Sequence, residues 1–292
     1  MSRVFKGEFP TEVVNGVKYT HIENDKAPHS PFINKNYDFE DGFYRGEFDF
    51  VSPIDGSLEN STPETYARHK VVAALQDYIK DKEGETAILD LGAGTLDIAR
   101  TIPASIASKI NLVNSDISGP WSVGQEASTI RGIEKLRERG LLENFASIEN
   151  VEYDFNTAEW PFAEDAFDYV VTNLVLCHVA YESKLEILKA LFSTLKPDGK
   201  VLIGDVFQKD ESGVRFTEAG LRGPEECWGY LSVFTEFLEM CREAGFKIDN
   251  TALDNLNEER NYQVQEELDY AKEHPHATMA VNKAVWFIEL HK

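Results

Sequence analysis

The sequence has few basic residues and few cysteines. Among its 292 residues, 29 lysines and arginines stand against 51 aspartates and glutamates, which gives a formal net charge of −22. Because such a charge repels phosphate backbones, we expect no general nucleic-acid binding; the acidity itself is typical of a soluble, solvated surface. The three cysteines lie far apart without a Cys-x-x-Cys pair, which favours a reducing compartment and argues against a zinc site.

Long apolar runs are absent as well. No stretch reaches the roughly 18 apolar residues that indicate a membrane-spanning helix, and residues 1–8 lack the apolar core of a secretory signal. We therefore expect a cytoplasmic protein with no membrane partner. The histidines are scattered, and the one close pair, His274 and His276, is typical of a solvated loop, so no metal site is expected. Hydrophobic residues make up 42% of the chain, which is enough for a sizeable core.

Residues 1–60 are rich in aromatic residues, Asn, Asp, Gly and Pro, and show no sustained period. Their aromatic residues gather at Tyr37, Phe39, Phe43, Tyr44, Phe48 and Phe50. So many aromatic side chains are unusual for a disordered tail. We predict an irregular arm over residues 1–60, either packed plainly on the main domain or acting as a lid over its active site.

Residues 61–292 alternate between apolar runs and amphipathic stretches. The apolar runs predict strands over residues 87–91, 110–115, 147–153, 167–174, 200–207, 246–253 and 284–290. Helices are predicted from Pro63 to about Gly84, over 97–107 with a break near Pro103, and over 130–139, 182–195, 225–244 and 258–273. The last of these lies in a helical insertion at about 255–280. This alternation predicts an α/β fold with a doubly wound, mainly parallel, seven-stranded sheet.

The first predicted strand ends in the most informative motif of the chain. Ala87–Leu91 runs into Gly92-Ala93-Gly94-Thr95, which predicts a buried strand and a tight turn that opens a helix. Glycines at such a turn let the backbone approach a ligand that a Cβ atom would block. In doubly wound sheets, ligands bind beyond the carboxyl ends of the strands. We therefore expect the N–H groups of this turn to face the polar tail of a ligand.

Three acids stand at the ends of three successive predicted strands. Asp90 precedes the glycine turn, Asp116 follows the second strand and Asp154 follows the third. A carboxylate about 20 residues past such a turn can accept from two ribose hydroxyls, and Asp116 lies 22 residues past Gly94. A phosphate is the competing ligand. Because we expect no basic residue near the turn and Asp97 would repel a phosphate, an uncharged or cationic nucleoside is favoured.

These motifs resemble the class I S-adenosylmethionine-dependent methyltransferases of the small-molecule type, over roughly residues 62–290. The family's D/E-x-G-x-G-x-G turn is matched by Asp90, Gly92 and Gly94, with Leu96 in place of the third glycine. Residues 161–168 resemble the family's PF-x-x-x-x-FD segment, and 195–199 resemble its LKPGG turn. The resemblance implies a Rossmann-like methyltransferase fold with an antiparallel edge pair. It also implies the cofactor S-adenosyl-L-methionine and the product S-adenosyl-L-homocysteine.

The resemblance also implies the residues of the site. Cofactor contacts fall on Asp90, Gly92, Ala93, Gly94, Asp116, Ile117, Asp154, Phe155 and Asn173. His178 and Asp205 are candidate proton acceptors. The alternative for His178 is packing near the cofactor, and that for Asp205 is an anchor for a substrate amine; methyl transfer often needs only alignment of the nucleophile. A set of aromatic residues is predicted either to wall the substrate pocket or to belong to the ordinary core: Tyr37, Tyr44, Trp121, Phe207 and Trp228.

We therefore predict a methyltransferase that moves a methyl group to an oxygen or nitrogen of a small molecule, with a specialised metabolite favoured as the acceptor. Metal-assisted transfer to catechols is disfavoured, because Thr172-Asn173 ends the fourth strand where a carboxylate would be needed. The Asn/Asp-Pro-Pro-Tyr/Phe motif for nucleobase amines is absent. Two alternatives stay open: a peptide or protein methyltransferase, and a methyltransferase-like fold repurposed for other chemistry. The oligomeric state is not predicted.

Overall fold

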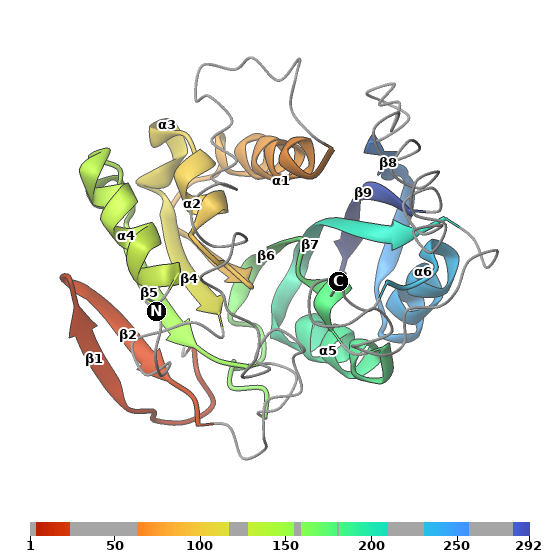
Figure 1. The fold of residues 1–292 in the computed structure, drawn as a ribbon, viewed down its shortest axis with the longest axis horizontal. Helices are drawn as coiled ribbons and strands as arrows, with labels where there is room; N and C mark the ends of the chain where they lie inside the picture. The colour runs from red at the N-terminus through yellow and green to blue at the C-terminus, as the bar shows by residue number, and fades with distance from the viewer. Residues whose placement is uncertain are drawn as a thin grey trace, which may run out of the picture.

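The computed structural model describes residues 4–23, 63–116, 128–154, 159–179, 181–209, 231–256 and 283–292 (Figure 1). Its described strands form one sheet in the order β1-β2-β5-β4-β3-β6-β7-β9-β8. Their bounds are β1 (Thr11–Val14), β2 (Val17–His21), β3 (Thr86–Leu91), β4 (Ile110–Asp116), β5 (Ser147–Glu152), β6 (Phe167–Asn173), β7 (Leu195–Gln208), β8 (Lys247–Asn255) and β9 (Lys283–His291).

The sheet is mainly parallel, as predicted. Strands β2, β5, β4, β3, β6 and β7 pair in parallel, whereas β9 runs antiparallel between β7 and β8. Strands β3 to β9 are the seven strands that the sequence predicts, and the antiparallel edge pair implied by the resemblance is β8 with β9. The predicted doubly wound fold is thereby confirmed.

Helices cover both faces of this sheet. The described helices are α1 (Pro63–Ile79), α2 (Asp97–Thr101), α3 (Ala104–Ala107), α4 (Ser128–Glu138), α5 (Tyr181–Thr194) and α6 (Phe234–Glu243), with short turns η3 (Leu142–Asn144) and η4 (Leu176–His178). Helices α2 and α3 are separated at Pro103, where the sequence predicts a break, because proline cannot donate the backbone hydrogen bond that would continue the helix.

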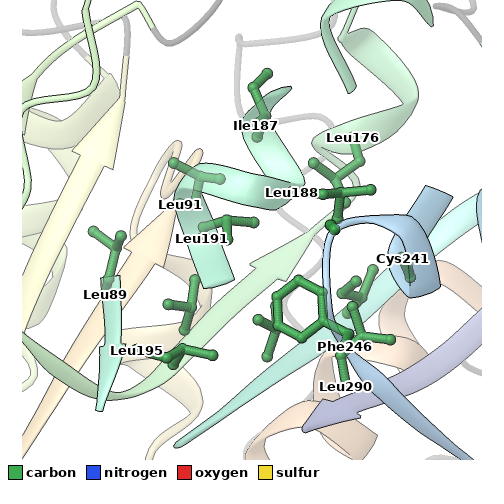
Figure 2. Packing of buried hydrophobic residues seen from close by; sticks show 14 of the residues in the cluster. Leu89, Leu91, Leu176, Ile187, Leu188, Leu191, Leu195, Cys241, Phe246 and Leu290 are labelled. Atoms are coloured by element: carbon green, nitrogen blue, oxygen red, sulfur yellow. The ribbon is translucent and has the colours of Figure 1, made fainter. Parts of the chain in front are cut away.

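Two hydrophobic clusters hold the layers together, one on each face. Alternate residues of β3 enter different clusters. Ile88 packs with α1 to α4 in the α1-side cluster, and Leu89 packs with α5 and α6 in the α5-side cluster. Figure 1 shows α1 and α5 on opposite sides of the sheet. Figure 2 shows the α5-side cluster, which includes Leu188 and Leu191 of α5, Cys241 of α6 and Phe246.

The amino-terminal region differs from the predicted irregular arm, because β1 and β2 form a hairpin that extends the sheet beyond β5. Asn15 and Gly16 connect the two strands with φ values of 52° and 75°. Asn-Gly with both residues at positive φ is the favoured two-residue hairpin turn, and it was the signal that sequence reasoning missed. Val17 and Tyr19 of β2 are buried in the core. The rest of the predicted arm, residues 24–62, lies outside the described residues.

Two predictions near the carboxyl terminus have different outcomes. The helix predicted over 225–244 begins only at Phe234, because residues 231–232 are not helical and Val233 is extended and bridges Gln208 of β7. The helical insertion predicted at about 255–280 falls almost entirely outside the described residues. Within the described part of the chain, none of the helices is long and apolar enough to cross a bilayer.

Candidate functional site

The order of the parallel strands reverses between β3 and β6, and this reversal locates the candidate site. From β3 the chain moves outward through β4 and β5, and it then returns to place β6 and β7 on the other side of β3. Ligands of doubly wound sheets bind beyond the carboxyl ends of the strands at such a switch point. Asp90, Asp116 and Asp154 stand at the carboxyl ends of β3, β4 and β5, so the fold brings the three predicted acids to one edge.

Asp90 is a buried carboxylate at this edge. It is 1% exposed, and none of the described residues donates a hydrogen bond to its Oδ2 atom. Burial raises the pKa of Asp90 well above its ordinary range, and the negative charges of Asp97 and Asp116 raise it further. A buried acceptor without a protein donor is costly, so its persistence is typical of a site completed by a ligand.

The glycine turn is joined directly to Asp116. The backbone N–H of Gly94 donates to Oδ2 of Asp116 over 2.8 Å. The N–H groups of Gly92 and Ala93 donate to the carbonyl of Ser115 over 2.7 and 3.0 Å. The expectation that the N–H groups of this turn face a ligand is therefore wrong for these three residues, because the end of β4 already accepts from each of them. What the turn offers a ligand is close approach of its backbone.

The two glycines of the turn have different roles. A Cβ atom on Gly92 would lie 2.3 Å from Cγ2 of Val175, so this glycine lets the turn pack against the segment after β6. A Cβ atom on Gly94 would meet no atom within 4 Å. Both residues have positive φ values, 72° and 50°. The space beside Gly94 is therefore open to the close approach of a ligand, whereas that beside Gly92 is filled.

Two arginines lie beside the turn, contrary to the expectation that no basic residue does. Arg68 of α1 and Arg100 of α2 both form ion pairs with Asp97, the former over 3.1 Å. Both arginines are buried. Sequence reasoning missed Arg68 because it reaches the turn only through the packing of α1 on α2, whereas the i,i+3 spacing of Asp97 and Arg100 was a visible signal. Asp97 pairs with both guanidinium groups and so offsets part of their positive charge.

Leu96, which stands in place of the family's third glycine, adopts a left-handed conformation with φ of 60°. Its side chain is fully buried among the residues of the α1-side cluster. Gly132 of α4 makes room for it: a Cβ atom there would lie 2.6 Å from Cγ of Leu96 and 2.7 Å from the carbonyl oxygen of Thr95. The departure from the family pattern is thus accommodated by a glycine on the facing helix.

Other predicted cofactor contacts are placed only in part. Asp154 follows β5 and is buried. Asn173 ends β6, with its Oδ1 atom 2.6 Å from where a Cβ atom on Gly204 would lie, so that glycine makes space for the amide. Ile117 and Phe155 lie outside the described residues.

The two candidate proton acceptors come from adjacent segments. His178 ends the turn η4, and its side chain lies outside what the structure describes. Asp205 of β7 is fully buried, and its Oδ2 atom accepts from the backbone N–H groups of Val175, Leu176 and Cys177 over 3.2, 2.7 and 3.2 Å. These hydrogen bonds favour a positioning role for Asp205 over the proton acceptor predicted from sequence.

Of the predicted substrate contacts, only Phe207 lies within the described residues. It is 2% exposed, and its ring packs 5.6 Å from that of Phe234 and 4.8 Å from that of Phe237. This packing favours the core alternative for Phe207 over a pocket wall. Tyr37, Tyr44, Trp121 and Trp228 fall outside the described ranges.

The fold and the site together define a doubly wound α/β protein with a glycine turn and carboxylates at the ends of three adjacent strands. A family model described as a methyltransferase domain matches residues 64–267, so the chain belongs to that family. The predicted class, an S-adenosylmethionine-dependent methyltransferase, is confirmed at this level. A curated relative, the ubiquinone/menaquinone biosynthesis C-methyltransferase UbiE of Wigglesworthia glossinidia brevipalpis, is 27% identical over 140 residues. That match covers 48% of this chain and about half of the relative's length, 50%.

Solved structures agree on the fold. The [4+2]-cyclase SpnF has a TM-score of 0.52 at 16% identity, with 76% of this chain and 80% of that chain covered. Phosphoethanolamine N-methyltransferase 2 of Haemonchus contortus, solved with S-adenosyl-L-methionine, has a TM-score of 0.51 at 16% identity. The match covers 84% of this chain and 59% of that chain. At such identities the likeness concerns the fold alone.

Proposed function

We propose that the carboxyl edge of the sheet binds S-adenosyl-L-methionine and that the enzyme moves its methyl group to an oxygen or nitrogen of a small molecule. The observation that carries the proposal is the buried Oδ2 atom of Asp90, which lacks a described protein donor and lies on the strand that leads into the glycine turn. When bound, the cofactor would supply a methyl group already activated by its sulfonium. The same cofactor is present in the solved Haemonchus contortus enzyme, and its demethylated product in a second structure of that enzyme.

Each acid has a distinct role in this proposal. Asp116 accepts from the ribose hydroxyls, with the Gly94 N–H fixing the direction of its carboxylate. Asp154 accepts from the exocyclic amine of adenine. Asp90 accepts from a donor at the methionine end of the cofactor, which satisfies its Oδ2 atom. These carboxylates bind and orient the ligand, and the protein's contribution to the rate is then mainly the alignment of the acceptor on the methyl group.

The charge of the chain bears on the class of acceptor. The net charge of −22 disfavours nucleic acids as substrates.

The test is an acceptor screen with S-adenosyl-L-methionine that carries a labelled methyl group. Small hydroxyl and amine compounds form one panel and peptides another, and the product is characterised by mass and by the atom methylated. We expect label in a small molecule at oxygen or nitrogen. Label only in the peptides would support the protein-methyltransferase alternative, and label at carbon would match the activity named for the UbiE relative. Cofactor binding without release of S-adenosyl-L-homocysteine in either panel would contradict the proposal.

A further inference from the structure

A buried polar cluster lies beneath the turn that follows β6, on the opposite face of the sheet from Asp90. Its members are Asp205 of β7, Cys177 of η4, Lys184 of α5 and Ser232, which precedes α6. All four residues are buried, Asp205 completely. A cluster of this kind is expensive to desolvate, so its arrangement calls for a physical explanation.

Asp205 is the centre of the cluster. Its Oδ2 atom accepts from three successive backbone N–H groups, those of residues 175–177, and Oδ1 accepts from the N–H of Val206 over 2.7 Å. The thiol of Cys177 also donates to this carboxylate. Burial raises the pKa of Asp205, while these donors and the charge of Lys184 oppose that rise. The carboxylate thus provides acceptors for the backbone N–H groups of residues 175–177 in the turn after β6.

Lys184 supplies the positive charge on this face. Its ammonium donates to the Ser232 hydroxyl over 2.9 Å. Burial lowers the pKa of Lys184 to about 8, although the charges of Asp205 and Cys177 act in the other direction. The Ser232 hydroxyl holds the ammonium between α5 and the start of α6, in the same buried cluster as the Asp205 carboxylate.

The turn that Asp205 holds makes direct contact with the glycine turn. Leu174 has a φ of 58°, and its N–H donates to the carbonyl of Gly204 over 2.8 Å, so the chain leaves β6 abruptly. Val175 then packs so tightly on Gly92 that a single added Cβ atom would overlap it. On the other side of the turn, Leu176 packs in the α5-side cluster with Leu188 (Figure 2). A shift of residues 174–177 would therefore move or loosen the glycine turn.

We propose that Asp205, balanced by Lys184, is a positioning residue that sets the glycine turn for cofactor binding through Val175. The inference rests on the proposed function, because it assumes that the glycine turn contacts the cofactor. Asp205 does not reach the ligand in this account. It fixes residues 175–177, Val175 fixes Gly92, and the Gly92–Gly94 turn fixes the carboxylate of Asp116 through the Gly94 N–H.

The test is calorimetric titration of the purified protein with S-adenosyl-L-homocysteine. Asp205→Asn keeps the volume but loses the charge and one acceptor oxygen, so it cannot accept from residues 175–177 and from the Val206 N–H at once. We expect it to weaken binding roughly tenfold, about what the loss of one hydrogen bond to a charged group costs. Lys184→Met should also lower the affinity for S-adenosyl-L-homocysteine. The matched control is Lys200→Met, which breaks the ion pair of Lys200 with Glu289 over 2.6 Å at the opposite end of β7. It should lower the melting temperature but leave the affinity within about twofold.

A double-mutant cycle separates positioning from general destabilisation. If Asp205 acts through Val175, then Val175→Ala should also weaken binding, and adding Asp205→Asn to it should cost much less than the roughly tenfold loss seen alone. Additive losses would overturn the route through Val175, and wild-type affinity in folded Asp205→Asn would overturn the inference. Should Asp205→Asn fail to fold, Val175→Ala and Lys184→Met carry the test, and wild-type affinity in both would overturn the inference. Failure of the wild-type protein to bind would instead contradict the proposed function.

Discussion

At the scale of single residues, Asp90 is a buried acceptor at the carboxyl edge of the sheet. Its carboxylate is buried beside Asp97 and Asp116, and its Oδ2 atom has no donor among the described residues. The raised pKa means that the protonated form stabilises the ligand-free fold. That contribution is complete below the ordinary pKa of Asp and is lost as the pH rises through the folded value. A ligand donor would reverse this preference, because it favours the ionised carboxylate.

This sign leads to a prediction about pH. Binding of S-adenosyl-L-homocysteine should release a proton where ligand-free Asp90 is protonated, so the affinity should rise with pH through that range. Asp90→Asn should weaken binding roughly tenfold or more, as the loss of a hydrogen bond to a charged group does, and it should flatten the dependence. Titration calorimetry in two buffers of different ionisation enthalpy measures the released proton. An unchanged pH dependence in Asp90→Asn would contradict this role for Asp90.

The residues of the site could be predicted from sequence where their role follows from position along a strand. Asp90, Asp116 and Asp154 were predicted in this way, and the fold places all three at one edge. Arg68 could not be predicted, since it reaches the turn from a helix that precedes β3. Asp205 was predicted as a possible base, whereas its hydrogen bonds favour a positioning role. A sequence shows that an acid lies at the end of a strand, but it does not show which backbone groups surround that acid.

At the scale of elements, the two glycines of the glycine turn should affect different properties: Gly92 the stability of the fold and Gly94 the affinity for the ligand. Gly92→Ala places a Cβ atom against Val175, and it should cost about 2 kcal/mol or more of unfolding free energy. Gly94→Ala meets no neighbour, so only its left-handed φ should cost stability, about 1 kcal/mol, whereas ligand affinity should fall as the new methyl group enters the open space. Urea unfolding and S-adenosyl-L-homocysteine titration of both variants test this contrast, and the reverse pattern would contradict it.

Helix α4 carries a second test of packing at the turn. Gly132→Ala would normally favour a helix by about 1 kcal/mol, but here the added methyl group meets Leu96 and the Thr95 carbonyl. We expect a net loss of about 1–3 kcal/mol in urea unfolding. The exposed Glu138→Ala, in the same helix, should change stability by no more than about 0.5 kcal/mol. A stabilised Gly132→Ala variant would mean that α4 can retreat from Leu96 without cost.

The elements themselves were largely predictable because buried parallel strands and amphipathic helices have distinct periods. The break at Pro103 and the seven strands β3 to β9 follow from those periods. The β1–β2 hairpin was missed because residues 1–60 were interpreted together as one irregular arm. The short strands on either side of Asn15 and Gly16 were therefore not considered separately. The start of α6 was placed too early, because Ser232 and Val233 pair with Gln208 at the end of β7, a contact that no local pattern reveals.

At the scale of the whole molecule, the hairpin protects an edge of the sheet. Strand β2 pairs with β5 and buries Val17 and Tyr19, which at about 1.5–3 kcal/mol each is a substantial part of the stability of a domain. A chain that begins at residue 24 should therefore unfold at a lower urea concentration. The shortened chain should also self-associate increasingly as the protein concentration is raised, because β5 becomes an exposed edge strand.

The control for this truncation is Val13→Lys. Val13 is 70% exposed on β1, so its replacement should leave the urea midpoint almost unchanged. Light scattering over a range of protein concentrations measures association of the shortened chain. A truncated protein with the wild-type midpoint would show that the hairpin adds nothing to the stability of the sheet.

The central claim is that the carboxyl edge of the sheet binds S-adenosyl-L-methionine through Asp116. Titration calorimetry of the wild-type protein, Asp116→Ala and the exposed-acid control Asp77→Ala tests it most directly. We expect wild-type binding of S-adenosyl-L-methionine and S-adenosyl-L-homocysteine that Asp116→Ala weakens by about 1.4 kcal/mol or more, a tenfold change. Asp77→Ala should bind like the wild type. Absence of binding by the folded wild-type protein, or equal binding by Asp116→Ala, would contradict the account.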